Sequence, residues 1–94
     1  MTAPGGKKID AIIVSASDNV ATCLNDIAAG ADAAIMLGRD ILSVRAGEAV
    51  PRGHKLAVKA IARGDAITKY GEVIGKASAD IAKGRHVHVH NVID

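Results

Sequence analysis

This 94-residue chain contains almost no aromatic residues. It has no Phe and no Trp, and Tyr70 is its single aromatic side chain. Because proteins that bind single-stranded nucleic acids stack the bases on aromatic side chains, this composition argues against a nucleic-acid partner. The apolar residues are mostly small or branched: 18 Ala, 11 Ile, 9 Val and 4 Leu. We therefore expect one small domain with a thin aliphatic core, which folds best when it also buries surface against a partner.

Disulfides, membrane spans and export signals are also missing. Cys23 is the single cysteine, so no disulfide can form within the chain and nothing points to an oxidising compartment. The longest apolar run, 33–37, has five residues, whereas about 20 are needed to cross a bilayer. The polar beginning, 1–8, lacks the apolar stretch of a signal peptide. We therefore expect a cytoplasmic protein with no membrane partner, and Met1 with this short beginning favours a complete chain over an excised domain.

The common catalytic signatures are absent as well. There is no phosphate-binding Gly-rich loop and no Gly-x-Ser-x-Gly nucleophile elbow. Cys23 stands in an apolar setting, which favours a small core residue over a nucleophile. Asp26 and Asp80 each precede a similar turn, where local capping is the simplest explanation. We assign no catalytic residue and expect the chain to supply part of a site.

The charges are distributed unevenly along the chain. Residues 1–51 carry a net charge of −2, whereas residues 52–85 hold eight basic and three acidic residues, a net charge of +5. Such a field favours an anionic ligand or partner. Strands that point Lys and Arg side chains into solvent explain any single position equally well.

A short pattern, Ile-Ala-x-Gly-x-x-apolar, occurs three times, beginning at Ile27, Ile61 and Ile81. Its glycines are 34 and then 20 residues apart, and this irregular spacing is not that of a stacked solenoid. The pattern predicts a turn with a buried Ile, a Gly with positive φ, and a new strand that leaves at the apolar position.

Strand-forming segments follow one another along the chain, separated by Gly turns. Asp18–Ala29 has a helical alternative capped by Ser17 or Asp18, but its alignment with the repeat favours a strand that runs into the turn. The segment 33–42 fits a short helix or a strand. Gly71-Glu72 predicts a tight hairpin turn. The other expected strands are 9–15, 55–59, 66–70, 73–77 and 86–92. The whole predicts a mostly β fold, a small barrel or clip with short helical turns.

Three of the four histidines lie within five residues, at His86, His88 and His90. On a strand they would share one face, with Val87 and Val89 anchored in the core on the other face. In a strand, the Cα atoms of residues i and i+2 are about 6.5 to 7 Å from each other. Two imidazole side chains at this spacing can converge on one divalent metal ion. The alternative is an exposed polar strand edge, and the missing ligands would have to come from elsewhere.

Several motifs together give the sequence a family resemblance. They are Asp18–Ala21, Gly53–Lys55, Lys69–Gly75, His86–Asn91 and the Asp-Ile-Ala-x-Gly turns. In this order they closely resemble the N-terminal SAF domain of the altronate and galactarate dehydratase family, over residues 18–92. In that family the domain precedes a large catalytic domain or forms a separate small subunit, as in sulfolactate sulfo-lyase. We therefore divide the chain into an N-terminal segment with the first strand, 1–17, and a SAF domain, 18–94.

The resemblance implies a β-clip fold and a lyase. Such an enzyme eliminates water or sulfite from a small anionic hydroxy acid and uses a divalent metal ion, typically iron. Carried over by position, the metal ligands are His86, His88 and His90, and the substrate end is lined by His54, Lys55, Lys69, Tyr70 and Asn91. The large catalytic portion is absent from this chain, so the resemblance implies a large catalytic subunit as the partner.

Two other functions remain open from the sequence. One is a stand-alone module that binds a metal ion or a small acid without catalysis, with a homo-oligomer as its possible state in isolation. The other is a docking domain whose histidine face contacts a partner.

Overall fold

The computed structural model describes residues 6 and 8–94, so the rest of the expected N-terminal segment, 1–5 and 7, lies outside the described residues. The described residues form nine strands and no helix. The strands are β1 (Ala11–Ile13), β2 (Val20–Cys23), β3 (Asp32–Leu37), β4 (Asp40–Arg45), β5 (Lys55–Ala57), β6 (Ala66–Lys69), β7 (Glu72–Ala77), β8 (His86–Val87) and β9 (Val92–Ile93). The expected β fold is confirmed, whereas the short helical turns are not found in this part of the chain.

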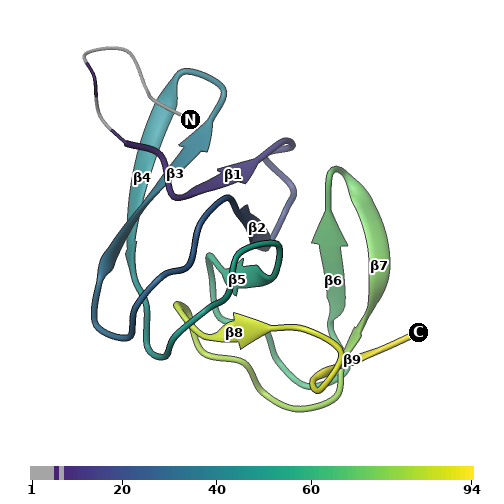
Figure 1. Ribbon diagram of the computed structural model, residues 1–94. Helices are drawn as coiled ribbons and strands as arrows, with labels where there is room; N and C mark the ends of the chain where they lie inside the picture. Colours follow the sequence, from purple (N-terminus) through teal and green to yellow (C-terminus); the bar gives the residue numbers. More distant parts are fainter. Residues whose placement is uncertain (1–5, 7) are drawn as a thin grey trace.

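The strands form two sheets, which lie side by side in Figure 1. The larger sheet has the order β4-β3-β1-β2-β5-β8, with β1 and β3 parallel and its other neighbours antiparallel. The smaller sheet has the order β6-β7-β9 and is antiparallel. Neither order closes on itself within the described residues, so the expected small barrel is not a closed one. The division expected at residue 17 stays a prediction, and β1 lies inside the larger sheet.

The structure decides between the alternatives left open by the sequence. The segment 33–42 belongs to the β3–β4 hairpin, in which Asp32 pairs with Arg45 and Leu37 with Asp40. The strand preferred over a helix after Asp18 is also confirmed, as β2. Over all described residues, no helix is long and apolar enough to cross a membrane.

Each copy of the repeated pattern forms the expected turn. Gly30, Gly64 and Gly84 have φ values of 82°, 86° and 89°, which is the conformation that position i+2 of a type II turn requires. The turns are closed by the hydrogen bonds Ala31 N to Ala28 O (3.1 Å), Asp65 N to Ala62 O (2.9 Å) and Arg85 N to Ala82 O (3.1 Å). The Ile of each copy is buried, and β3, β6 and β8 start after the turns.

The aspartates before these turns act over a longer range than expected. The carboxylate of Asp26 accepts a hydrogen bond from Arg52 N, and that of Asp80 accepts one from Arg63 N, each at 2.8 Å. Both bonds therefore tie one turn to a distant segment. Local capping was the wrong explanation, because each carboxylate lies beside a turn that is distant in the sequence, and the fold alone brings the two together.

A cluster of buried aliphatic side chains joins the two sheets. Its members are Val20, Ala57, Ile61, Ile67, Ala77, Ile81 and Val87. They come from β2, β5 and β8 of the larger sheet, from β6 and β7 of the smaller sheet, and from two repeat turns. A second cluster lies on the larger sheet around Ile13, Ile35 and Leu56. The core is aliphatic, as the composition predicted.

The hairpin between β6 and β7 turns one residue earlier than expected. Its turn residues are Tyr70 and Gly71, with φ values of 55° and 78°, as in a type I′ turn. Only Gly adopts this conformation freely, and for a residue with a Cβ atom it has a conformational free-energy cost of about 1–2 kcal/mol. The buried carboxylate of Asp18 accepts hydrogen bonds from Tyr70 N (3.0 Å) and Gly71 N (2.8 Å) and holds the turn in place.

Asp18 and Asn19 together fasten the smaller sheet to the larger one. Burial raises the pKa of the Asp18 carboxyl, but backbone N–H donors outweigh it and hold the pKa below its usual value. The Asn19 side chain donates to Ala66 O (2.8 Å) and accepts from Thr68 N (2.9 Å). These bonds set the position of β6, which carries Lys69 at its end.

Candidate metal centre

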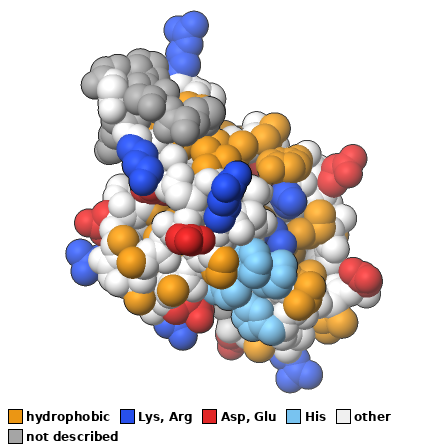
Figure 2. All heavy atoms as spheres, viewed as in Figure 1, with side chains coloured by type: hydrophobic (Ala, Val, Ile, Leu, Met, Phe, Trp, Pro, Cys, Tyr) orange, Lys and Arg blue, Asp and Glu red, His pale blue; other side chains and the backbone are white. Residues whose placement is uncertain are grey.

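The histidine cluster is formed by the pairing of β5 with β8. In this antiparallel pair Lys55 is opposite Val87 and Leu56 is opposite His86. The same register places His54, just before β5, opposite His88, just after β8. Side chains alternate along a strand, so His86 and His88 emerge on one face and His54 joins them from the neighbouring strand. Figure 2 shows the histidine side chains gathered in one surface patch, with basic and hydrophobic side chains around it.

The ligand atoms of His54, His86 and His88 all lie within 4.8 Å of one another. His54 Nδ1 is 2.8 Å from His86 Nε2, and the rings of His54 and His88 are stacked with their centroids 3.6 Å apart. His88 Nδ1 is buried and has no hydrogen-bond partner among the described residues. A buried ring nitrogen without a partner is costly, and a metal ion would supply one. The donor set therefore fits a divalent ion that accepts imidazole ligands.

The electrostatics of the cluster favour neutral imidazoles, which are the form that binds metal. Burial lowers the pKa of His86, and His90 and His54 lower it further, while Glu48 acts in the opposite direction. Burial also lowers the pKa of His88, with added contributions from His54 and Lys55. Burial, together with the nearby positive charges, thus leaves these two rings with fewer protons to displace.

The long strand expected over 86–92 is wrong beyond Val87. The chain turns at 88–91, where Asn91 N donates to His88 O (3.1 Å), and then enters β9, which pairs with β7 of the smaller sheet. Val87 is fully buried as expected, but Val89 is 81% exposed and does not anchor the core. The strict alternation of the sequence was misleading because the chain leaves one sheet for the other at this point.

His90 consequently lies beside the cluster. Its ring centroid is 4.9 Å from that of His86, with the planes tilted by 43°, and its side chain is exposed. The three converging ligand atoms belong to His54, His86 and His88. The family resemblance assigned His54 to the substrate end. His54 lies 32 residues from His86 in the sequence, and only the β5–β8 register brings the two together.

Lys55 lies next to His88, and Lys69 lies near Lys55. Burial lowers the pKa of Lys55, and Lys69 lowers it further, so the two ammonium groups act on each other. The Lys69 Nζ atom is 4.9 Å from the centre of the Tyr70 ring, which is 44% exposed. The ion pairs found among the described residues, Arg45–Asp32 and Arg85–Glu48, involve neither lysine. The positive charges of Lys55 and Lys69 are thus available to an anion.

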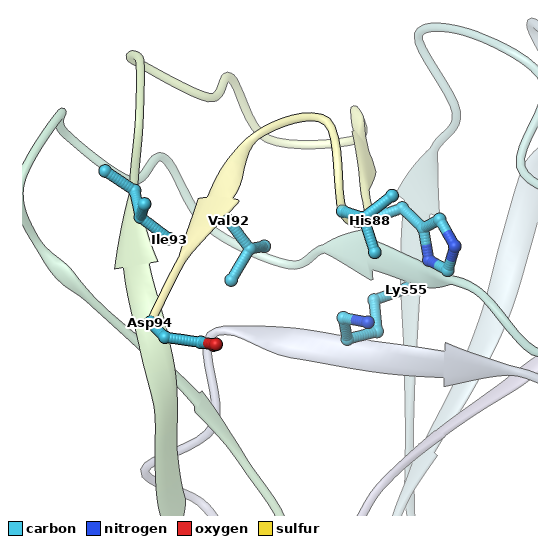
Figure 3. Close-up of a pocket in the computed structure, with 6 residues that line it drawn as sticks. Lys55, His88, Val92, Ile93 and Asp94 are labelled. Atoms are coloured by element: carbon cyan, nitrogen blue, oxygen red, sulfur yellow. The ribbon is translucent and has the colours of Figure 1, made fainter.

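A cavity of about 400 Å³ opens beside His88. It is lined by Lys55, His88, Val89, Val92, Ile93 and Asp94. Figure 3 shows Lys55 and His88 at one side of this cavity, Val92 between them and Ile93, and Asp94 on the far side. A small acid in this space would meet Lys55 and His88 on one side, the apolar Val92 and Ile93 next to them, and the Asp94 carboxylate on the far side.

Two side chains hold the backbone of the histidine segment. Glu48 Oε2 accepts a hydrogen bond from His86 N (3.1 Å) and forms an ion pair with Arg85 Nε (3.3 Å). The amide of Asn91 bonds to the backbone of both His86 and His88. Sequence reasoning missed Glu48 completely, because 38 residues separate it from His86. It placed Asn91 near the site but gave no sign of these contacts.

The described residues thus form an all-β domain in which three histidines could hold a metal ion, with Lys55 beside them. The model of one protein family, the altronate/galactarate dehydratase SAF domain, matches residues 9–94. The chain belongs to this family, as its motifs predicted.

Individual relatives agree with this assignment. The chain is 46% identical over 80 residues to altronate dehydratase from Escherichia coli, and 41% identical over 80 residues to altronate dehydratase from Bacillus subtilis. Each match covers 85% of this chain and 15% of the relative. It is also 52% identical over 42 residues to (2R)-sulfolactate sulfo-lyase subunit alpha from Paracoccus pantotrophus, which covers 45% of this chain and 63% of that subunit. The chain thus spans a small part of the altronate dehydratases.

Proposed function

We propose that the chain is a small SAF-domain subunit of a metal-dependent lyase that eliminates water or sulfite from an anionic hydroxy acid. The observation that carries this proposal is the convergence of His54, His86 and His88 beside Lys55, in a chain of this family. We also propose that its two sheets form the β-clip arrangement that the resemblance implied.

In this proposal His54, His86 and His88 hold a divalent metal ion, with iron as our first expectation. The lowered pKa values of His86 and His88 favour the neutral imidazoles that a metal requires. When bound, the ion supplies Lewis-acid polarisation of a hydroxyl or carboxylate oxygen. His90, which the resemblance named as a ligand, stands beside His86 at the edge of the group.

Lys55 and Lys69 bind the carboxylate of the substrate in the same proposal. Both carry charge that the ion pairs of the described residues leave uncompensated, and Lys55 lines the cavity beside His88. Tyr70 stands next to Lys69 on a turn fixed by Asp18, so it is placed to contact the same ligand. Val92 and Ile93 supply the apolar side of the cavity.

The base that removes the α-proton is assigned to a large catalytic subunit. Imidazoles that hold a metal ion cannot also accept a proton, and a lysine that binds a carboxylate stays charged. The partner is supported by the 15% coverage of the altronate dehydratases and by the subunit named in the sulfo-lyase match.

The test is a native pull-down of the tagged chain from its own cell extract, followed by mass analysis and reconstitution. We expect a stoichiometric large partner, and turnover of an anionic hydroxy acid by the mixture but not by either chain alone. A chain that comes out alone, or a mixture with no lyase activity, would contradict the proposal.

A second function is favoured by one observation: all three converging ligand atoms belong to this single chain. A stand-alone module would bind metal without a partner and without catalysis. It predicts full metal affinity in the isolated chain, lost in the His54→Ala, His88→Ala double variant, and no large partner in the pull-down.

A further inference from the structure

Asn91 bonds to the backbone of two histidines at once. Its Oδ1 atom accepts a hydrogen bond from His88 N at 3.0 Å, and its Nδ2 group donates to His86 O at 2.9 Å. Its own backbone N–H donates to His88 O at 3.1 Å and closes the turn 88–91. The oxygen and the amino group of the side chain thus each have a protein partner.

These side-chain contacts satisfy backbone groups that a neighbouring strand would otherwise bond. β8 is the last strand of the larger sheet, so no strand among residues 8–94 pairs with its outer edge. On that edge the N–H group of His86 donates to Glu48, and its carbonyl oxygen accepts from Asn91. His88 lies beyond the end of β8, where the sheet no longer sets its position. Its backbone is held by the turn that Asn91 closes.

We propose that Asn91 is a positioning residue for the metal centre, which sets the relative placement of His86 and His88. This inference rests on the proposed function, because it requires that the histidines bind metal. Asn91 lies behind the histidines, bonded to their backbone. Its role is therefore to fix the ligands, in place of the contact with substrate that the resemblance implied. Side chains that orient metal ligands typically change the metal affinity by about 10- to 100-fold when they are replaced.

Two variants separate the two halves of the Asn91 contact. Asn91→Ala removes both side-chain bonds, whereas Asn91→Asp keeps the acceptor for His88 N and places an oxygen against His86 O. The matched control is Asn25→Ala, because the half-buried Asn25 also uses its side-chain amide in a hydrogen bond, donating to Asp10 at 2.8 Å, and this bond involves no histidine. Circular dichroism first establishes that each variant is folded at the titration temperature.

The measurement is a calorimetric titration of each full-length chain with Zn²⁺, with the Co²⁺ absorption spectrum as a second readout. We expect both Asn91 variants to bind Zn²⁺ about 10- to 100-fold more weakly and to change the Co²⁺ spectrum, whereas Asn25→Ala stays within about twofold of the wild type. Equal affinity and spectrum in the folded Asn91 variants would overturn the role of Asn91 alone. A wild-type chain that binds neither ion would overturn the metal centre and this inference together.

Discussion

His54 Nδ1 and His86 Nε2 lie 2.8 Å apart although 32 positions separate the two residues in the sequence. The distance follows from the antiparallel pairing of β5 with β8, in which Leu56 is opposite His86. The same register sets His54 across from His88. The strand pair therefore brings His54 and His86 together, and the turn closed by Asn91 holds His88 beside them, so any change that shifts β8 against β5 disperses the group.

The histidines should differ in their effect on metal binding. We expect His54→Ala, His86→Ala and His88→Ala each to abolish tight Zn²⁺ binding, because each removes one of the converging ligand atoms. His90→Ala should have a much smaller effect, within about tenfold, because its ring stands outside that group. Calorimetric titration of the four variants measures the order. Loss of binding in His90→Ala with retention in His54→Ala would show that the ligands are those the sequence alone predicted.

Asp18 should stabilise the fold in a pH-dependent way. Its buried carboxylate accepts hydrogen bonds from Val14, Ser15, Tyr70 and Gly71, and Asp18→Asn replaces an acceptor by a donor at this site. We expect a loss of about 2–3 kcal/mol in the free energy of unfolding at pH 7. Urea denaturation of the metal-free chain measures it.

The sign of the pH effect follows from the lowered pKa of Asp18. The folded state holds the carboxylate ionised, so its stabilising effect is complete above the ordinary value of 3.8 and is lost as the pH falls through the lower folded-state pKa. Asp18→Asn should remove this part of the acid transition. The control Asp40→Asn, at an exposed carboxyl on β4, should leave both the stability and the acid transition unchanged.

Two glycines of the repeat, Gly64 and Gly84, provide a matched pair for testing how closely the turn before β8 packs against Arg45. Gly64 and Gly84 have nearly the same φ, 86° and 89°, but a Cβ atom at Gly64 would meet nothing within 4 Å. A Cβ atom at Gly84 would meet the Arg45 carbonyl oxygen. We expect Gly64→Ala to cost about 1–2 kcal/mol through its backbone conformation, and Gly84→Ala to cost about 1–3 kcal/mol more.

The variants Gly64→Ala and Gly84→Ala should also differ in their affinity for a metal ion. Gly84 lies two residues before His86, so a displaced turn would move β8 and weaken Zn²⁺ binding in Gly84→Ala. Gly64→Ala should bind as the wild type does. Chemical denaturation and a metal titration test the two variants, and equal losses of stability in both would contradict the close packing of Gly84 on Arg45.

The lysines should act on the anionic ligand and leave the metal in place. Lys55→Gln removes a positive charge beside His88 and Lys69→Gln removes one near Lys55, so in each variant the KM of the reconstituted enzyme for its acid should rise by about tenfold or more. Zn²⁺ affinity should stay within about twofold of the wild type. Lys59→Gln, at an exposed lysine after β5, is the control with no expected change. An unchanged KM in both variants would remove the lysines from the substrate site.

Local turns were predictable from the sequence. The Ile-Ala-x-Gly turns need only a buried Ile and a Gly with positive φ, and all three copies form as expected. The hairpin was displaced by one residue, because the distant Asp18 carboxylate holds Tyr70 in a conformation that its own sequence disfavours. Local preference was overruled there by a contact across 52 positions.

The candidate site was predictable in its chemistry but not in its geometry. The histidine pattern indicated metal binding, yet His54 joins the group only through the β5–β8 register. Strict alternation over 86–92 predicted one strand, whereas the chain changes sheets after Val87. Glu48 had no signal in the sequence, since its function depends on where the outer edge of β8 lies.

The most direct test of the metal centre is anomalous diffraction from crystals of the full chain grown with Zn²⁺. We expect one strong peak within bonding distance of ring nitrogens from His54, His86 and His88, with Asn91 still bonded to the backbone behind them. A peak held by His86, His88 and His90 without His54, or no peak at this face in crystals with Zn²⁺ in excess, would contradict it.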